Sequence, residues 1–223
     1  IDDIELNKLR RENFENLQTI SHYYVRDNRV FELYILLRLL SIQFFKGRLE
    51  ADRREIENFL VENINVINNG NWRNVFITLQ SLGLINKNNL PTKSGIEIIY
   101  FGYENFAYEA YEAFFKPYFD EIYEIAIDTE INLSNQEILN KIKDKYNGKD
   151  IMYLTESNGR YISSWLNIMR DDYGILDFQP RNNQRRVIYN IHDLKKNKVL
   201  ENIKNNSIAK DYINNFYELM NEI

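Results

Sequence analysis

Four polar residues recur along the chain at intervals of three and four positions: Arg160, Ser163, Asn167 and Arg170, with Ser164 beside them. In an α-helix this spacing places the side chains on one face. Arginine can pair with guanine, asparagine with adenine and serine with either, and all three also bond to phosphate oxygens. The segment therefore predicts a helix that reads DNA through its outward face.

A second polar group follows in and after the loop 179–184. Its members are Arg181, Gln184, Arg185 and Arg186. In the flanking runs 175–178 and 185–191, apolar and polar residues alternate as is typical of strands. Asn182 and Asn183 favour a turn between them. A hairpin of this kind could lie along a neighbouring groove or backbone, so we expect these side chains to contact DNA as well.

The helix that would carry the first polar group has an apolar stripe and a glycine stop. The stripe is Ile162, Leu166, Met169 and Tyr173, followed by Gly174. An earlier stretch has the same pattern in Trp72, Phe76, Leu79 and Leu82, followed by Gly83, with one residue fewer before the glycine. The sequence thus indicates one module present twice. The matching polar face of the first copy includes Arg73 and Asn74 but is much less basic, so it predicts either weak DNA contact or a partner-facing surface.

Two short phrases point to a family. Leu82-Gly83-Leu84-Ile85 ends the third of three predicted helices, and Thr92-Lys93-Ser94-Gly95 follows a short turn. This order resembles a winged-helix domain, within the helix-turn-helix superfamily, whose wing is very short. The resemblance implies DNA binding through the third helix and the wing of each module.

The predicted fold class is mainly α with small β-hairpins, arranged as two winged-helix-like modules. We expect an N-terminal helix at 1–29 and a C-terminal helix at 197–223, either of which could mediate a homodimer. Residues 30–102 form the first module, an acidic helical linker occupies 103–132, and the second module is 133–196. The stripe of the last helix includes Ile213, Phe216 and Met220, and would cover the second module or a second subunit.

Composition narrows the classes of function. The 223 residues include no cysteine and two histidines, which excludes disulfides and thiolate metal sites. The sequence shows neither a membrane-length apolar run nor a signal peptide or lipidation motif, so we expect a cytoplasmic protein that does not contact membranes. Its first residue is isoleucine, which is consistent with a fragment of a larger protein. We expect no cofactor.

The acidic charge is concentrated in one stretch. Eight acidic residues and one lysine lie between 103 and 130, so this stretch carries −7 and the remainder about +2 of a net charge of −5. A remainder of this kind permits a basic face. Asp120, Glu124 and Asp128 share a helix face, as carboxylates of a divalent-metal site would, but repeated acids on a helix are more typical of a solvated surface, and we expect no metal site.

The leading hypothesis is duplex DNA binding by a transcriptional regulator or by the recognition part of a restriction or defence system. One alternative is a protein-interaction scaffold, because tandem winged helices of acidic character also resemble the kleisin-associated proteins of chromosome condensation. A weaker alternative is a metal-dependent nuclease using Asp177 with Asp193 and Lys195. The sequence contains no phosphate-binding glycine loop or nucleophile elbow, and it predicts no catalytic residues.

Overall fold

The computed structural model describes residues 25, 28–64, 72–129, 132–145, 159–178, 185–191 and 196–221. For 126–129, 132–134, 159–161, 178, 185–191 and 196–197 it describes the backbone alone. The described part is mainly helical, as the sequence predicts. It holds no helix long and apolar enough to cross a membrane.

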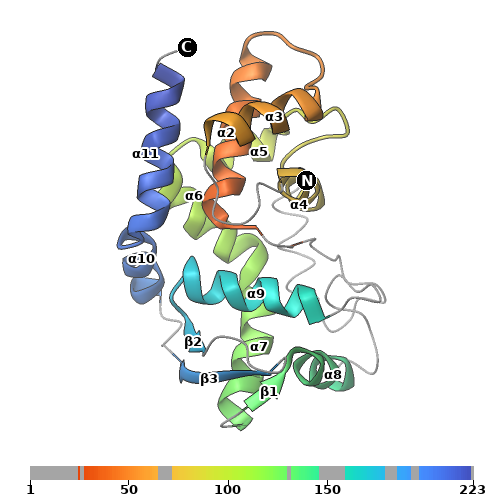
Figure 1. Ribbon diagram of the computed structural model, residues 1–223, viewed down its shortest axis with the longest axis vertical. Helices are drawn as coiled ribbons and strands as arrows, with labels where there is room; N and C mark the ends of the chain where they lie inside the picture. Colours follow the sequence, from red (N-terminus) through yellow and green to blue (C-terminus); the bar gives the residue numbers. More distant parts are fainter. Residues whose placement is uncertain are drawn as a thin grey trace.

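Four helices, named here the α2–α5 group, form one end of the molecule (Figure 1). They are α2 (Val30–Phe45), α3 (Arg53–Asn63), α4 (Trp72–Ser81) and α5 (Lys93–Ile99). The first turns of α2 are buried on every side, which follows from a sequence that is apolar nearly all round. Helix α3 begins at the Asp52 cap, whose carboxylate accepts from the Glu55 N–H at 3.0 Å.

The two sequence motifs Leu82–Ile85 and Thr92–Gly95 form the connection between α4 and α5. Gly83 has a φ of 73°, and the Leu84 N–H bonds to the Leu79 carbonyl at 3.0 Å, as in a Schellman motif. The Thr92 hydroxyl then donates to the Gly83 carbonyl at 2.7 Å and accepts from the Gly95 N–H at 3.1 Å. The short wing expected here is a single bridge between Ile85 and Pro91. Both phrases therefore have a structural role.

One helical run passes from this group towards the opposite end (Figure 1). It comprises α6 (Tyr103–Ala110), a π-helical turn η1 (Tyr111–Phe115) and α7 (Lys116–Thr129). In η1 the Lys116 N–H bonds to the Tyr111 carbonyl, five residues earlier. Pro117 has no N–H to donate, but the chain stays helical through it into α7. Phe106, Phe114 and Phe119 are fully buried. The segment expected as an acidic linker therefore contributes a whole helix face to the core.

The remaining elements before the C-terminal helices are named here the β1–β3 group. They are β1 (Asn132–Ser134), α8 (Asn135–Lys145), α9 (Gly159–Asp171), β2 (Leu176–Phe178) and β3 (Arg185–Ile191). Both strands expected after α9 are present. Strand β1, which the sequence pattern does not indicate, joins them in an antiparallel sheet of order β1-β3-β2. The register shifts between Asp177 and Phe178.

The C-terminal segment forms two helices instead of one. Helix α10 (Lys196–Lys204) ends near Asn206, whose side-chain oxygen accepts from the Ala209 N–H at 3.2 Å and so begins α11 (Ser207–Asn221). Helix α11 packs on α2, where the rings of Tyr212 and Phe31 stack 4.6 Å apart. Phe216 is also buried. This apolar stripe therefore packs on α2 of the same chain, whereas we had expected it to cover the second module or a second subunit.

Candidate nucleic-acid interface

Helix α9 ends in a wider form of the turn that ends α4. Gly174 has a φ of 59°, like Gly83 in the first copy. The Ile175 N–H bonds to the Met169 carbonyl at 2.8 Å, and the Tyr173 N–H to the Ile168 carbonyl at 3.2 Å. The wider turn accommodates the extra residue of the second copy. The two helices thus both end at a glycine of positive φ, whereas the presence of one module twice stays a prediction.

The inward face of α9 is held by aromatic packing. All four members of the predicted stripe, Ile162, Leu166, Met169 and Tyr173, are fully buried. The Trp165 ring stacks on Tyr118 of α7 with centroids 4.6 Å apart and meets Phe115 edge-on at 5.7 Å. The Tyr173 hydroxyl donates to the Ala107 carbonyl at 2.8 Å. Helix α9 is therefore fixed firmly against the α6–α7 run.

The expected outward face of α9 is more enclosed than the sequence suggested. Ser164 is 2 % exposed, so its outward placement was wrong. Ser164, Ile168 and Asp172 are all buried and lie four residues apart, which makes a second buried line beside the predicted stripe. Ser163 and Asn167 are half-buried and make contacts within the protein.

Arg170 is the one predicted arginine of α9 whose side chain the structure describes. It is half-buried, and its guanidinium is bidentate on Asp171, with Nε to Oδ1 at 2.6 Å and a second nitrogen to Oδ2 at 3.1 Å. For Arg160 the structure places the backbone in the first turn of α9. The adjacent Asp171 carboxylate neutralises Arg170 and would repel a phosphate, so α9 offers fewer ready contacts than its sequence predicts.

The hairpin residues are described only in part. Arg185 and Arg186 begin β3, where their Cα atoms pair with Ser134 and Leu133 of β1. The loop that carries Arg181 and Gln184 lies outside the described residues. The backbone of β3 thus places two of the predicted arginines beside β1, at the strand end next to that loop.

In the first copy, the polar face of α4 is covered from within the chain. Asn74 is buried, and the Asn28 amide donates to the Asn74 carbonyl at 3.5 Å and to the Thr78 hydroxyl. Arg73 is exposed. The outward placement of Asn74 was therefore wrong, because the chain before α2 packs on that side of α4.

A buried ion pair joins the two groups at the end of α9. Arg29 Nε lies 3.0 Å from Asp172 Oδ2, and the side chains are 6 % and 1 % exposed. The Val30 N–H also donates to Asp172 at 3.4 Å, and the Arg29 guanidinium donates to the Asp171 carbonyl at 3.3 Å and lies over the Phe31 ring. The pair therefore ties the start of α2 to the end of the candidate recognition helix.

The environment of this pair alters its protonation equilibrium. Burial raises the pKa of the Asp172 carboxyl to about 6, although the Arg29 guanidinium and the Val30 N–H oppose the rise. Burial lowers the pKa of Arg29, but attraction to Asp172 outweighs it and the net pKa is raised. Both groups are therefore charged at pH 7.5.

Replacing Arg29 by methionine should make stability depend more steeply on pH. The folded pKa of Asp172 exceeds its ordinary value of 3.8, so its contribution to stability is fully present below about pH 4 and is lost as the pH rises through about 6. Without Arg29 that pKa rises further, so the stability deficit relative to the unmodified chain should be larger at pH 7.5 than at pH 5. Urea unfolding at pH 5 and at pH 7.5 measures this stability deficit. A deficit equal at both would contradict this, and Arg170→Met serves as the control.

Three acidic residues of α7 are paired with lysines. Asp120 binds Lys116 at 2.8 Å, and Lys145 of α8 bridges Glu121 at 2.8 Å and Glu124 at 2.6 Å. No cluster of three or more potential metal ligands occurs among the residues whose placement the structure gives. The side chain of Asp128 lies outside that part. The two Lys145 pairs therefore connect α7 to α8, and the Lys116–Asp120 pair lies within α7.

The residues of the nuclease alternative are only partly described. Asp177 is half-buried in β2, opposite Asn190 of β3, and it has contacts within the protein. Asp193 and Lys195 fall in a stretch that is not described. The described residues therefore do not test whether these three side chains come together.

No protein-family model, curated protein or solved structure matches this chain.

Proposed function

We propose that the chain binds duplex DNA through the β1–β3 group, acting as a winged-helix unit. The observation that carries the proposal is the order α7, β1, α8, α9, β2, β3, with β1 paired to β3 and β3 to β2. This resembles the winged-helix arrangement, in which the third helix and the hairpin meet DNA. Here α7, α8 and α9 are the three helices.

In this proposal phosphate contacts provide most of the affinity. The contacts come from Arg160 and Arg170 of α9 and from the arginines at 181–186, and Gln184, Ser163 and Asn167 belong to the same proposed set. Ser164 and Asn74 are removed from the set because both are buried. The α2–α5 group then supports α9 through the Arg29–Asp172 pair, and the exposed Arg73 adds at most a peripheral contact. A regulator or the recognition part of a restriction or defence protein would use such a surface.

Removing single arginines tests this assignment. Arg160→Ala and Arg185→Ala should each weaken binding to random duplex DNA by about tenfold or more, since a hydrogen bond to a charged group contributes about 1.5–3 kcal/mol. Fluorescence anisotropy with a labelled duplex measures the change. The matched control is Arg54→Ala, an exposed arginine of α3 at the other end of the molecule, which should leave binding unchanged. Equal effects of all three would count against the assignment.

A protein-interaction scaffold is the second candidate, and exposed aromatic rings favour it. Phe45, Tyr100 and Phe101 are all more than 70 % exposed at the end formed by the α2–α5 group. If the chain binds no DNA but binds a protein partner through these rings, the result supports the scaffold function. The nuclease alternative predicts magnesium-dependent cleavage of the same duplex.

A further inference from the structure

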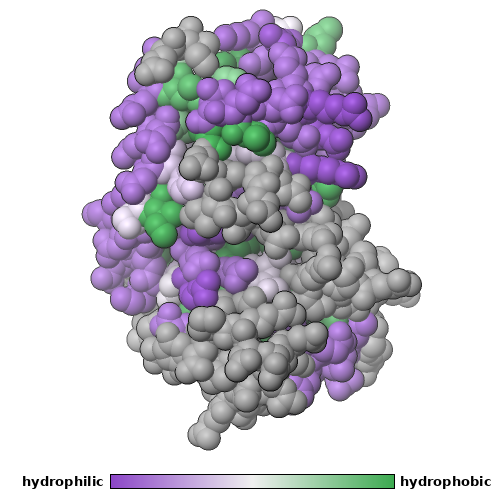
Figure 2. All heavy atoms as spheres, viewed as in Figure 1, coloured by the Kyte–Doolittle hydropathy of each residue, from purple (hydrophilic) through white to green (hydrophobic). Residues whose placement is uncertain are grey.

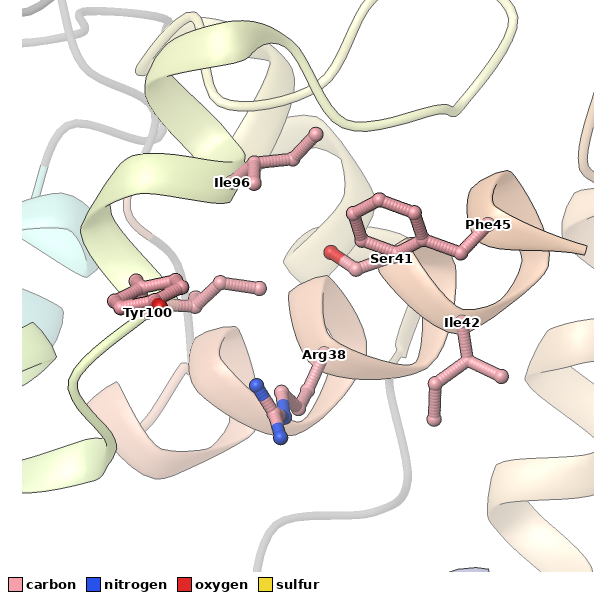
Figure 3. Close-up of a pocket in the computed structure, with 7 residues that line it drawn as sticks. Arg38, Ser41, Ile42, Phe45, Ile96 and Tyr100 are labelled. Atoms are coloured by element: carbon pink, nitrogen blue, oxygen red, sulfur yellow. The ribbon is translucent and has the colours of Figure 1, made fainter.

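A groove runs between α2 and α5. It is lined by Arg38, Ser41, Ile42 and Phe45 from α2, by Ile96 and Ile99 from α5, and by Tyr100, which directly follows α5 (Figure 3). Its volume is about 320 Å³. The four α2 residues lie at i, i+3, i+4 and i+7, so they follow one helix face over two turns. A mainly apolar groove between two helices is a surface to which the apolar face of a third helix can bind.

Aromatic rings extend the apolar surface beyond the groove. Phe45 is 72 % exposed and meets Phe44 edge-on, with centroids 5.5 Å apart. Tyr100 and Phe101, at 73 % and 76 % exposure, form a similar pair at 5.0 Å. Figure 2 shows green apolar patches among the hydrophilic side chains at this end of the molecule. Exposed aromatic groups that adjoin a groove are typical of protein-binding surfaces, and they make the site larger than a small ligand needs.

Arg38 gives the groove a charge preference. It is the charged member of the lining, it is half-buried, and no residue in the described part of the chain forms an ion pair or hydrogen bond with it. The Ser41 hydroxyl, beside it, donates to the Leu37 carbonyl at 2.7 Å, which leaves its oxygen as an acceptor only. A half-buried guanidinium in an apolar groove is best satisfied by a carboxylate that arrives with the occupant.

We propose that the α2–α5 groove docks an amphipathic helix of a protein partner, with apolar side chains in the slot and a glutamate or aspartate against Arg38. The Phe45, Tyr100 and Phe101 rings cover the sides of that helix. This site is separate from the β1–β3 group, so the proposal does not depend on DNA binding.

Selection from a displayed library of 15-residue helical peptides on the full chain tests the proposal. The library fixes leucine or phenylalanine at i, i+4 and i+7 and varies the other positions. The selected peptides should carry an acid at one position. Their affinity should fall about tenfold with Arg38→Met or Tyr100→Ser and stay unchanged with Val61→Ser, an exposed apolar residue of α3 outside the groove. Unfolding curves check that each variant is folded.

Charge inversion separates this proposal from its rivals. Arg38→Glu should reject the selected acidic peptides and bind versions in which lysine replaces the acid. Three results would overturn the proposal: no enrichment of peptides, enriched peptides that Arg38→Met and Tyr100→Ser do not affect, and self-association of the chain that Tyr100→Ser abolishes. The last result, measured by sedimentation, would assign the groove to a second copy.

Discussion

Replacing Asp172 by alanine is expected to lower the free energy of unfolding by about 3–5 kcal/mol, the usual cost of breaking a buried ion pair from one side. The Arg29 guanidinium would stay buried without its carboxylate, and the Val30 N–H would lose its acceptor. Urea unfolding followed by circular dichroism at pH 7.5 measures the loss. Because the pair joins the start of α2 to the end of α9, the loss also measures how strongly the two groups depend on each other.

The neighbouring acid is the control for this result. Asp171→Ala removes a half-exposed carboxylate that pairs with Arg170, so it should cost no more than about 1 kcal/mol. The double variant Arg29→Met, Asp172→Leu should recover most of the loss, since an apolar pair of similar volume needs no charge compensation. Equal losses for Asp171→Ala and Asp172→Ala would show that the buried pair is not an important link.

Gly95→Ala is expected to destabilise the chain by about 3 kcal/mol, the upper part of the usual range for overpacking. An added Cβ would lie 2.1 Å from the Leu84 carbonyl oxygen and 3.3 Å from a Leu37 methyl group. The first of these is a backbone atom held by the Thr92 N–H at 3.0 Å, so it cannot move aside without breaking the joint between α4 and α5. Alanine has the better helix propensity by about 1 kcal/mol, which makes a loss diagnostic of the contact.

A glycine with free space around it provides the comparison. Gly47 has a φ of 81°, and an added Cβ there meets no atom within 4 Å. Gly47→Ala should therefore cost only the backbone strain of about 1 kcal/mol. A Gly95→Ala variant as stable as Gly47→Ala would mean that α5 can shift away from Leu84.

Local patterns predicted the elements well. The stripe of Ile162, Leu166 and Met169 fixed the buried side of α9, and glycines at 83 and 174 ended both helices because few other residues tolerate their positive φ. The strands at 175–178 and 185–191 followed from alternation and turn residues. These features depend on neighbours within about ten residues, so a single sequence reveals them.

Long-range contacts could not be predicted in this way. Arg29 and Asp172 are 143 positions apart, and nothing in either local pattern marks them as partners. On an isolated helix Ser164 lies on the polar face. In the folded chain it is buried together with Ile168 and Asp172, which follow it at four-residue intervals. The acidic count between 103 and 130 suggested a solvated linker, whereas the interleaved aromatic residues bury one side of that helix. Burial of a mixed face is decided by what packs on it.

A salt series on random duplex DNA is the decisive measurement for DNA binding by the β1–β3 group. If about four or five phosphates are neutralised, the logarithm of the association constant should fall against the logarithm of salt concentration with a slope of about −4. Arg185→Ala should reduce that slope by about 1. Binding that does not depend on salt, or no binding at low salt, would contradict the claim.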